Sequence, residues 1–244
     1  MTRSNLTNIL LLLAFPAVLS SCGEIFGKRI HGNGNVTTQD RPVSNFKNVE
    51  VGGAAKVLVS QGDRNSVKIE VDENLQQFVE VLQEGNKVVV RTKPGYNLDP
   101  SGDLKIHVTS PVYNDIDASG ACDIIGQGTI TNPEKMSLHI SGAGDMKMEL
   151  NAPEIDAEVS GSGNVDLKGE TKNVDIDLTG AANAHCFDLK SETTKVEISG
   201  AGTADVYASV KLSAEVSGAG TVNYKGGGQV DQHVSGAGSI HKAD

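Results

Sequence analysis

The amino-acid sequence predicts an all-β protein whose larger part is a β-solenoid. A Ser-Gly-Ala-Gly-like tetrapeptide occurs seven times between residues 119 and 238, at intervals of 18 to 22 residues. Around each copy, apolar and polar residues alternate with the period of two that β-strands require. Gly is abundant, at 28 residues, which suits a fold with many tight turns.

The overall composition excludes several classes of function. Asp and Glu number 31 against 21 Lys and Arg, which gives a formal net charge of −10. A nucleic-acid-binding protein needs a basic face, and so does a protein that docks electrostatically on anionic lipid. Aromatic residues make up 4% of the chain and Trp is absent, which argues against a site built on stacking with sugars or bases. We therefore expect no nucleic-acid partner.

The amino terminus has the three parts of a secretory signal peptide over residues 1–21. A basic start contains Arg3, an apolar run follows over residues 9–19, and small residues end the segment. A membrane-spanning helix needs roughly 20 apolar residues, so this run is too short to cross a bilayer. The segment is therefore interpreted as a signal peptide.

The end of this segment, Leu19-Ser20-Ser21-Cys22, resembles the lipobox of bacterial lipoproteins. The resemblance implies cleavage before Cys22 and lipidation of its thiol, and several acyl chains together anchor a protein firmly to a membrane. The alternative is an ordinary signal peptide that ends on a chance Cys. Residues 22–35 are expected to be a flexible lipidated tether. Because no Asp follows Cys22 directly, the outer membrane is favoured, with the leaflet left open.

Residues 36–111 are predicted to be the irregular β part of the domain. The stretch at 49–59 (VEVGGAAKVLV) resembles one repeat with Gly52 in the Ser position, and short alternating runs predict further strands. Residues 74–84 are expected to form a short helix or a strand, and residues 94–103 a loop. This part is expected to cap or begin the solenoid.

Residues 112–244 carry the repeat. The residue before each copy is apolar, the residue two before it is polar, and the residue three before it is apolar except at Gln232. One repeat cannot bury its apolar face alone, but stacked repeats form a continuous core with rungs about 4.8 Å apart. A meander of hairpins closing into a sandwich or barrel is the alternative that the alternation also allows.

The tetrapeptides themselves are predicted to be structural turns. Their Gly residues supply a positive φ or permit close approach of two backbones. The predicted turn residues are Ser141, Gly142, Gly144, Ser160, Gly161, Gly163, Ser199, Gly200, Gly202, Ser217, Gly218, Gly220, Ser235, Gly236 and Gly238.

Together, three features resemble the head GIN domain family of auto-transporter adhesins, which is common among Bacteroidetes lipoproteins. They are the opening stretch at 41–53 (RPVSNFKNVEVGG), the following VLVSQG at 57–62 and the later Ser-Gly-Ala-Gly repeats. The resemblance covers roughly residues 36–240. It implies a β-helical domain outside the cytoplasm, and it brings no catalytic motif.

The search for reactive or metal-binding residues predicts no enzyme, no cofactor and no metal. Asp and Asn residues follow several bends, at Asp123, Asp145, Asn164 and Asn183, but calcium-binding repeats place such a turn every nine residues. The six His residues lack zinc spacing, and neither a nucleophile triad nor a distinct carboxylate pair stands out. A column of outward acidic residues could gather cations or could be a solvated face, and it comprises Glu158, Asp177, Glu197 and Glu215.

The two cysteines of the domain are predicted to be unpaired. Cys122 and Cys186 lie three repeats apart, which corresponds to roughly 14 Å in a solenoid. A disulfide needs Cα atoms within about 7 Å of each other. We therefore expect two free thiols.

These observations favour a membrane-anchored, non-catalytic lipoprotein outside the cytoplasm that acts as a surface binding or adhesion module for an unknown protein or glycan. The alternative is a structural or envelope-associated lipoprotein that faces the periplasm. An enzyme resembling β-helical polysaccharide lyases lacks support, since those bring basic and aromatic side chains to a groove. The oligomeric state is open, although exposed terminal strand edges permit end-to-end association.

Overall fold

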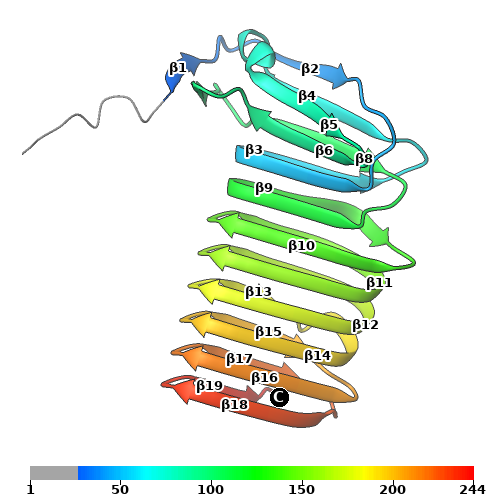
Figure 1. Cartoon of the computed structure of the whole chain (residues 1–244), viewed down its shortest axis with the longest axis vertical. Helices are drawn as coiled ribbons and strands as arrows, with labels where there is room; N and C mark the ends of the chain where they lie inside the picture. Colours follow the sequence, from blue (N-terminus) through cyan, green and yellow to red (C-terminus); the bar gives the residue numbers. More distant parts are fainter. Residues whose placement is uncertain (1–26) are drawn as a thin grey trace, which may run out of the picture.

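Two kinds of β-structure make up the computed structural model, which describes residues 27–244: a stack of parallel rungs and an irregular cap at its amino-terminal end (Figure 1). The predicted signal peptide, Cys22 and the first part of the predicted tether lie outside the described residues. The described elements are β1 (Lys28–His31), β2 (Val36–Arg41), β3 (Asn48–Gln61), β4 (Ser66–Asp72), η1 (Glu73–Phe78), β5 (Val79–Glu84), β6 (Lys87–Thr92), β7 (Tyr96–Asp99), β8 (Lys105–Ser110), β9 (Asp115–Thr131), β10 (Lys135–Gly142), β11 (Asp145–Gly161), β12 (Asn164–Gly180), β13 (Asn183–His185), β14 (Leu189–Gly200), β15 (Thr203–Tyr207), β16 (Lys211–Gly218), β17 (Thr221–Lys225), β18 (Gln229–Gly236) and β19 (Ser239–Lys242).

The repeats stack in register as a β-solenoid of about 7 turns, which confirms the predicted fold class. Equivalent residues of successive copies pair in parallel, as Ser141 does with Ser160 and Ser217 with Ser235. Parallel pairing between copies differs from the antiparallel hairpins that a meander would require. The period of the tetrapeptide is therefore the length of one turn of the coil.

Each turn contributes to two parallel sheets that meet at the Ser-Gly-Ala-Gly bend. We call the strands leading into the bends the acidic sheet; they are β10, β16, β18 and the matching halves of β3, β9, β11, β12 and β14. The strands following the bends form the ladder sheet, which contains β13, β15, β17, β19 and the other halves of the long strands.

The core lies between the two sheets and consists of stacked columns of like side chains. In one column, each of the five successive residues is at most 2% exposed: Leu138, Ala157, Ile176, Val196 and Ala214. Burial of such apolar surface is the main favourable term in folding. Gln232 follows them in register and is exposed, because it belongs to the last rung.

The cap begins where the regular stack ends, above β3. Parallel β6 continues the acidic sheet beyond β3, and parallel β8 continues the ladder sheet. Antiparallel strands then take over, since β4 pairs with β8, β2 pairs with β4, and β5 pairs with β6. The first rung is therefore covered by strands of the same chain.

Two segments of the amino-terminal part differ from the sequence-based expectations, whereas residues 74–84 contain both of the elements expected there as alternatives. Within the predicted tether, Lys28–His31 form β1, which pairs in parallel with β7. This pairing also places a strand inside the predicted loop at 94–103. The Arg29 guanidinium lies 3.0 Å from the Asp99 carboxylate. This ion pair supports the pairing of β1 with β7, which the sequence repeat does not predict. Residues 73–84 hold the short helix η1 followed by β5.

Among residues 27–244, no helix is long and apolar enough to cross a membrane.

Candidate binding surfaces

The bends between the two sheets are shaped by two Gly residues with different tasks. Gly161, the first Gly of its tetrapeptide, has a φ of 128°, and a Cβ there would collide with the carbonyl oxygen of Gly142 in the preceding rung. Gly144, the second Gly of its own tetrapeptide, would bring a Cβ against the carbonyl oxygen of Cys122. Positive φ and close backbone approach are the two conditions that only Gly tolerates well. These bends hold the rungs together and present few functional groups.

The acidic sheet presents two adjacent outward columns rich in carboxylates. The column two residues before each bend contains the four acidic residues predicted from the sequence, and it also holds His139 and His233. A second column runs beside it, displaced by two residues along each strand. We call the carboxylates of both columns the acidic face: Glu50, Asp115, Asp117, Asp156, Glu158, Asp175, Asp177, Glu197, Glu215 and Asp231.

Few cations offset this negative charge. Lys195 lies 3.2 Å from Asp175 and 2.7 Å from Glu197, and Lys135 lies 3.1 Å from Asp156. Lys87 pairs with Glu50, and His139 lies near Asp115 and Glu158. Within residues 27–244, four members of the face take part in no ion pair, namely Asp117, Asp177, Glu215 and Asp231.

The electrostatic consequence appears in the pKa values of the carboxyl groups. Burial raises the pKa of Asp117, and the nearby carboxylates of Glu50 and Asp115 raise it further. Burial likewise raises the pKa of Asp177, assisted by Asp175 and Glu197. Proximity of like charges and partial desolvation both disfavour the ionised form.

Some oxygens of this face also lack donors. The Oδ1 atoms of Asp115, Asp175 and Asp177 are buried and accept no hydrogen bond from the described residues. Buried acceptors of this kind are usually satisfied. The exposed carboxylate oxygens of the acidic face carry the unbalanced negative charge, which suits this surface to a cationic partner.

The ladder sheet carries a different array, in which side chains bond to each other from rung to rung. The Asn164 Nδ2 group donates to Asp145 Oδ1 (2.7 Å), and the Asn183 Nδ2 group donates to Asn164 Oδ1 (3.0 Å). The Thr203 N–H in turn donates to Asn183 Oδ1 (3.1 Å). The Asp and Asn side chains after the bends, for which the sequence favours no calcium site, therefore form hydrogen bonds with residues of the adjacent rungs.

No group of three or more His, Cys, Asp or Glu within residues 27–244 is arranged to hold a metal ion. His185 lies 3.0 Å from Asp205 on the ladder sheet. In the cap, His107 lies 3.2 Å from Glu70.

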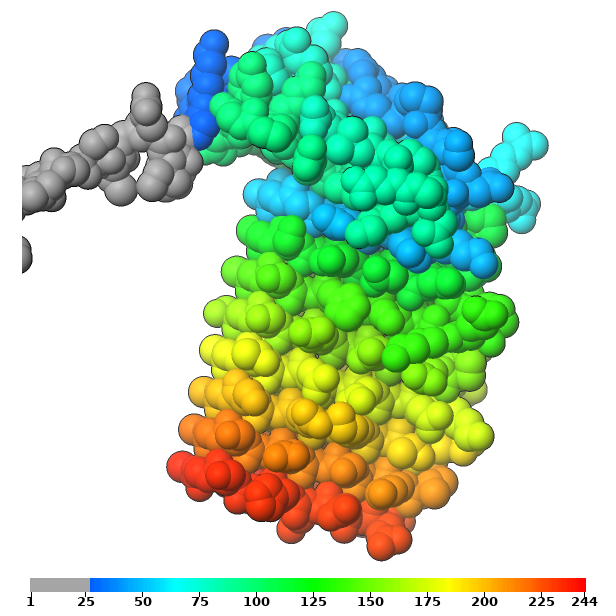
Figure 2. All heavy atoms as spheres, in the orientation of Figure 1, coloured from blue at the N-terminus to red at the C-terminus, as the bar shows by residue number. Residues whose placement is uncertain are grey.

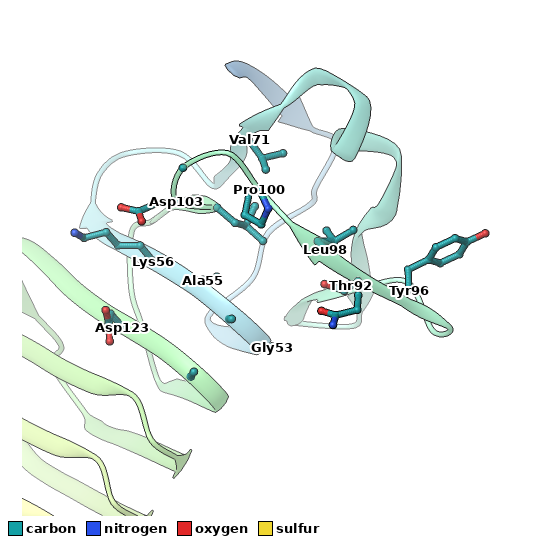
Figure 3. A pocket seen from close by; sticks show the side chains of 15 residues that line it. Gly53, Ala55, Lys56, Val71, Thr92, Tyr96, Leu98, Pro100, Asp103 and Asp123 are labelled. Carbon is teal, nitrogen blue, oxygen red and sulfur yellow. The ribbon is translucent and has the colours of Figure 1, made fainter. Parts of the chain in front are cut away.

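A groove of about 600 Å³ separates part of the cap from the first two rungs (Figure 3). Val71, Leu98 and Pro100 line the cap side. Lys56, Asp103 and Asp123 gather at one end, whereas the Tyr96 side chain points away from the groove. The lining mixes apolar and charged residues, and the groove could not be predicted from the sequence because the cap residues follow no repeat.

The two thiols of the domain are buried and unpaired in the described part of the chain. Cys186 stacks between Leu167 and Val206 in the core, and burial raises the pKa of its thiol to about 12. Burial also raises the pKa of Cys122. Because the thiolate is the reactive species, neither group is suited to nucleophilic chemistry.

Sequence reasoning found one acidic column and missed its neighbour. The missed members include Asp115, Asp156 and Asp175, and a signal for them was present four residues before each bend. In that position Ser and Lys interrupt the acidic series, so the position does not stand out in the sequence. The structure shows that two columns, rather than one, form the face (Figure 2 displays the same stack with all atoms).

Comparisons with known proteins place these surfaces in context. The family described as "Putative auto-transporter adhesin, head GIN domain" matches residues 45–228. A crystal structure from Bacteroides fragilis described as a "putative adhesin" is 21% identical, covers 88% of this chain and 100% of its own, and has a TM-score of 0.82. A Parabacteroides distasonis structure described as a "putative lipid binding protein" is 23% identical, covers 89% and 100%, and has a TM-score of 0.75. A "putative adhesin" from Parabacteroides merdae is 21% identical, covers 89% and 100%, and has a TM-score of 0.68. No curated protein sequence matches the chain.

Proposed function

Since the chain belongs to the family described as "Putative auto-transporter adhesin, head GIN domain", we propose that it is a lipid-anchored, non-catalytic binding module displayed on the outside of the cell. The proposal assigns the membrane attachment to Cys22 and the binding to the acidic face. The partner is a protein or glycan that presents cationic groups.

The acidic face is the observation that carries this proposal. It extends from β3 to β18, and Asp117, Asp177 and Glu215 lack ion pairs within the described residues. Charge complementarity over an extended surface raises association rates and selects partners. Burial raises the pKa of Asp117 and Asp177, and neighbouring carboxylates raise it further; a cationic partner would relieve this second contribution.

The short segment between Cys22 and β1 supports the proposed attachment from the opposite end of the molecule. β1 fixes residues 28–31 to the cap, so only five residues separate Cys22 from the strand. An extended chain spans at most about 3.5 Å per residue, which keeps the cap within roughly 20 Å of a membrane. The stack would then project away from the anchor with both sheets accessible.

Anchoring and orientation are tested together in intact cells. Surface protease should remove the protein while a periplasmic control survives, and Cys22→Ala should release the protein from the membrane fraction. Digestion only after lysis would favour the alternative, an envelope-associated lipoprotein that faces the periplasm. Retention of the Cys22→Ala variant in the membrane would contradict the lipid anchor.

Binding is tested with poly-L-lysine as a defined cationic probe. A triple variant with Asp117→Asn, Asp177→Asn and Glu215→Gln should bind the probe about 10-fold more weakly than the unaltered protein at moderate salt. The matched control neutralises three exposed loop carboxylates through Asp63→Asn, Glu134→Gln and Asp188→Asn. The control has the same net charge, so equal losses in both variants would show that total charge, rather than the acidic face, governs binding.

A further inference from the structure

The last rung of the stack presents an open β-edge. β18 pairs with β16 and β19 pairs with β17, and neither strand has a second partner within residues 27–244. At the opposite end, the cap covers the first rung (Figure 1). An uncovered edge offers a row of unpaired N–H and C=O groups to another strand. The cap blocks head-to-tail stacking of the regular rungs, so the stack itself offers an open edge only at its last rung.

The hydrogen-bonding groups that face this open edge can be identified. The Gln229 N–H donates to Val210 O (2.8 Å), toward the stack. Backbone groups of successive residues in a strand point to opposite sides, so those of Asp231 and His233 also face the stack. The groups left free belong to Val230, Gln232 and Val234. Their side chains lie on the core face, in register with Leu212, Ala214 and Val216.

We propose that two copies of this chain pair through β18 in antiparallel orientation, about a two-fold axis at Gln232. In this register Val230 lies opposite the partner's Val234, and Asp231 lies opposite the partner's His233. Gln232 of one chain lies opposite Gln232 of the other. The free backbone N–H and C=O groups of Val230, Gln232 and Val234 then form hydrogen bonds between the two chains. A two-fold contact is self-complementary by nature, as this segment is.

Neighbouring registers are less complementary. An axis at Asp231 places the two Asp231 carboxylates opposite each other, and an axis at His233 places the two imidazoles opposite each other. Like charges directly across an antiparallel pair are destabilising. Only the axis at Gln232 matches apolar with apolar and acidic with basic positions.

The exceptional residue in the core column also fits this arrangement. Gln232 replaces the apolar residue found in the five preceding rungs, and Val234 is 39% exposed on the same strand. A carboxamide has both donors and an acceptor, so two facing Gln side chains can bond to each other. The column thus ends on a side chain whose polar groups are hydrated in the monomer and hydrogen-bonded in the dimer.

Disulfide trapping tests the register in the full chain. Cα atoms of a hydrogen-bonded antiparallel pair lie about 5.5 Å apart, within the range of a disulfide. Gln232→Cys in cells treated with a mild oxidant should therefore yield a covalent dimer. The matched control Val230→Cys puts the two new thiols about 13 Å apart along the strands, and it should yield at least about 10-fold less dimer. Equal yields from the two variants, or no dimer from either, would overturn the proposal.

A charge exchange provides a second test that does not depend on thiol chemistry. The chain from Gly23 onward contains every described element, and circular dichroism of each variant checks its fold. In sedimentation equilibrium, Asp231→Lys and His233→Asp should each weaken self-association about 10-fold, and the double variant should recover most of that loss. A monomer at all concentrations, or a double variant no better than the singles, would refute the pairing.

Discussion

The stack and the cap solve the same packing problem by different means. In the stack, equivalent positions of successive rungs have the same surroundings, as Leu138, Ala157 and Ile176 have in one core column. In the cap, each residue makes contacts that occur nowhere else in the described structure. Asp72, for example, is 1% exposed and accepts hydrogen bonds from the Gly34 N–H (2.6 Å) and from the N–H and hydroxyl of Ser101.

Both regions bury an apolar core. The stack adds the same close backbone approach in every rung, whereas the cap adds individual polar contacts. In a solenoid, energies add over neighbouring repeats. In the cap, a buried polar group that loses one partner is left unsatisfied. The two regions should therefore respond differently to the same kind of substitution.

The largest expected effect is at the Gly residues. Gly161 in the stack and Gly85 in the cap both have positive φ, but a Cβ at Gly161 collides with Gly142 O, whereas a Cβ at Gly85 meets nothing within 4 Å. Gly161→Ala should destabilise by about 4 kcal/mol and Gly85→Ala by about 1 kcal/mol. Urea unfolding measures both. Similar losses would mean that backbone strain alone, without the rung-to-rung contact, sets the sensitivity of the stack.

The next largest loss of stability is expected when a buried carboxamide of the cap is removed. Gln76 is 4% exposed, and its Nε2 group donates to Thr37 O (2.7 Å) and Ile69 O (3.0 Å). Gln76→Leu leaves these carbonyls without their donor and should destabilise by about 2 kcal/mol.

The matched polar position in the stack is Asn183, which bonds within the solvent-facing ladder. Asn183→Ala should cost only about 0.5 kcal/mol, because water can replace the lost partner. A larger loss at Asn183 than at Gln76 in the same unfolding assay would reverse the proposed contrast between the two regions.

The same contrast explains how much the sequence could predict. The rungs, their register and one acidic column follow from positions that repeat every 18 to 22 residues. The pairing of β1 with β7 and the groove beneath the cap follow from contacts between segments about 70 residues apart, such as Arg29 with Asp99. These contacts occur once and leave no period in the sequence. Gln232 lies between the two cases, since the pattern marks it as an exception and only the structure places it on an open edge.

The pH dependence of stability should have opposite signs in the two regions. Hydrogen bonds from Ser101 hold the pKa of Asp72 below its usual value, so its contribution to stability is present above the unfolded pKa of about 3.9 and is lost as pH falls through the lower folded pKa. Burial and the neighbouring Asp175 raise the pKa of Asp177. The native state therefore binds that proton at higher pH than the unfolded state, and stability rises as pH falls from the folded pKa toward 3.9.

Substitutions at the two carboxyl groups separate these contributions in melting curves between pH 3 and 7. Asp177→Asn should raise stability at pH 7 by about 0.5 kcal/mol once solvent screening is allowed for, and it should flatten the gain on acidification. Asp72→Asn should lower the melting temperature at pH 7 and flatten the loss below pH 4. Destabilisation at pH 7 by Asp177→Asn would contradict the repulsion assigned to the acidic face.

The smallest effect concerns one cation in each region, and it depends on how many opposite charges each cation serves. Lys195 is shared by Asp175 and Glu197 on the acidic face, whereas in the cap Lys105 and His107 together serve the single carboxylate of Glu70. Lys195→Met should destabilise by about 0.5 kcal/mol at low ionic strength, since it leaves two carboxylates without their cation among like charges, and salt should erase the loss. Lys105→Met should show a weaker salt dependence because His107 remains beside Glu70. If the two variants lost stability equally at every salt concentration, the excess negative charge of the stack would have no energetic consequence, and the acidic face would be an ordinary solvated surface.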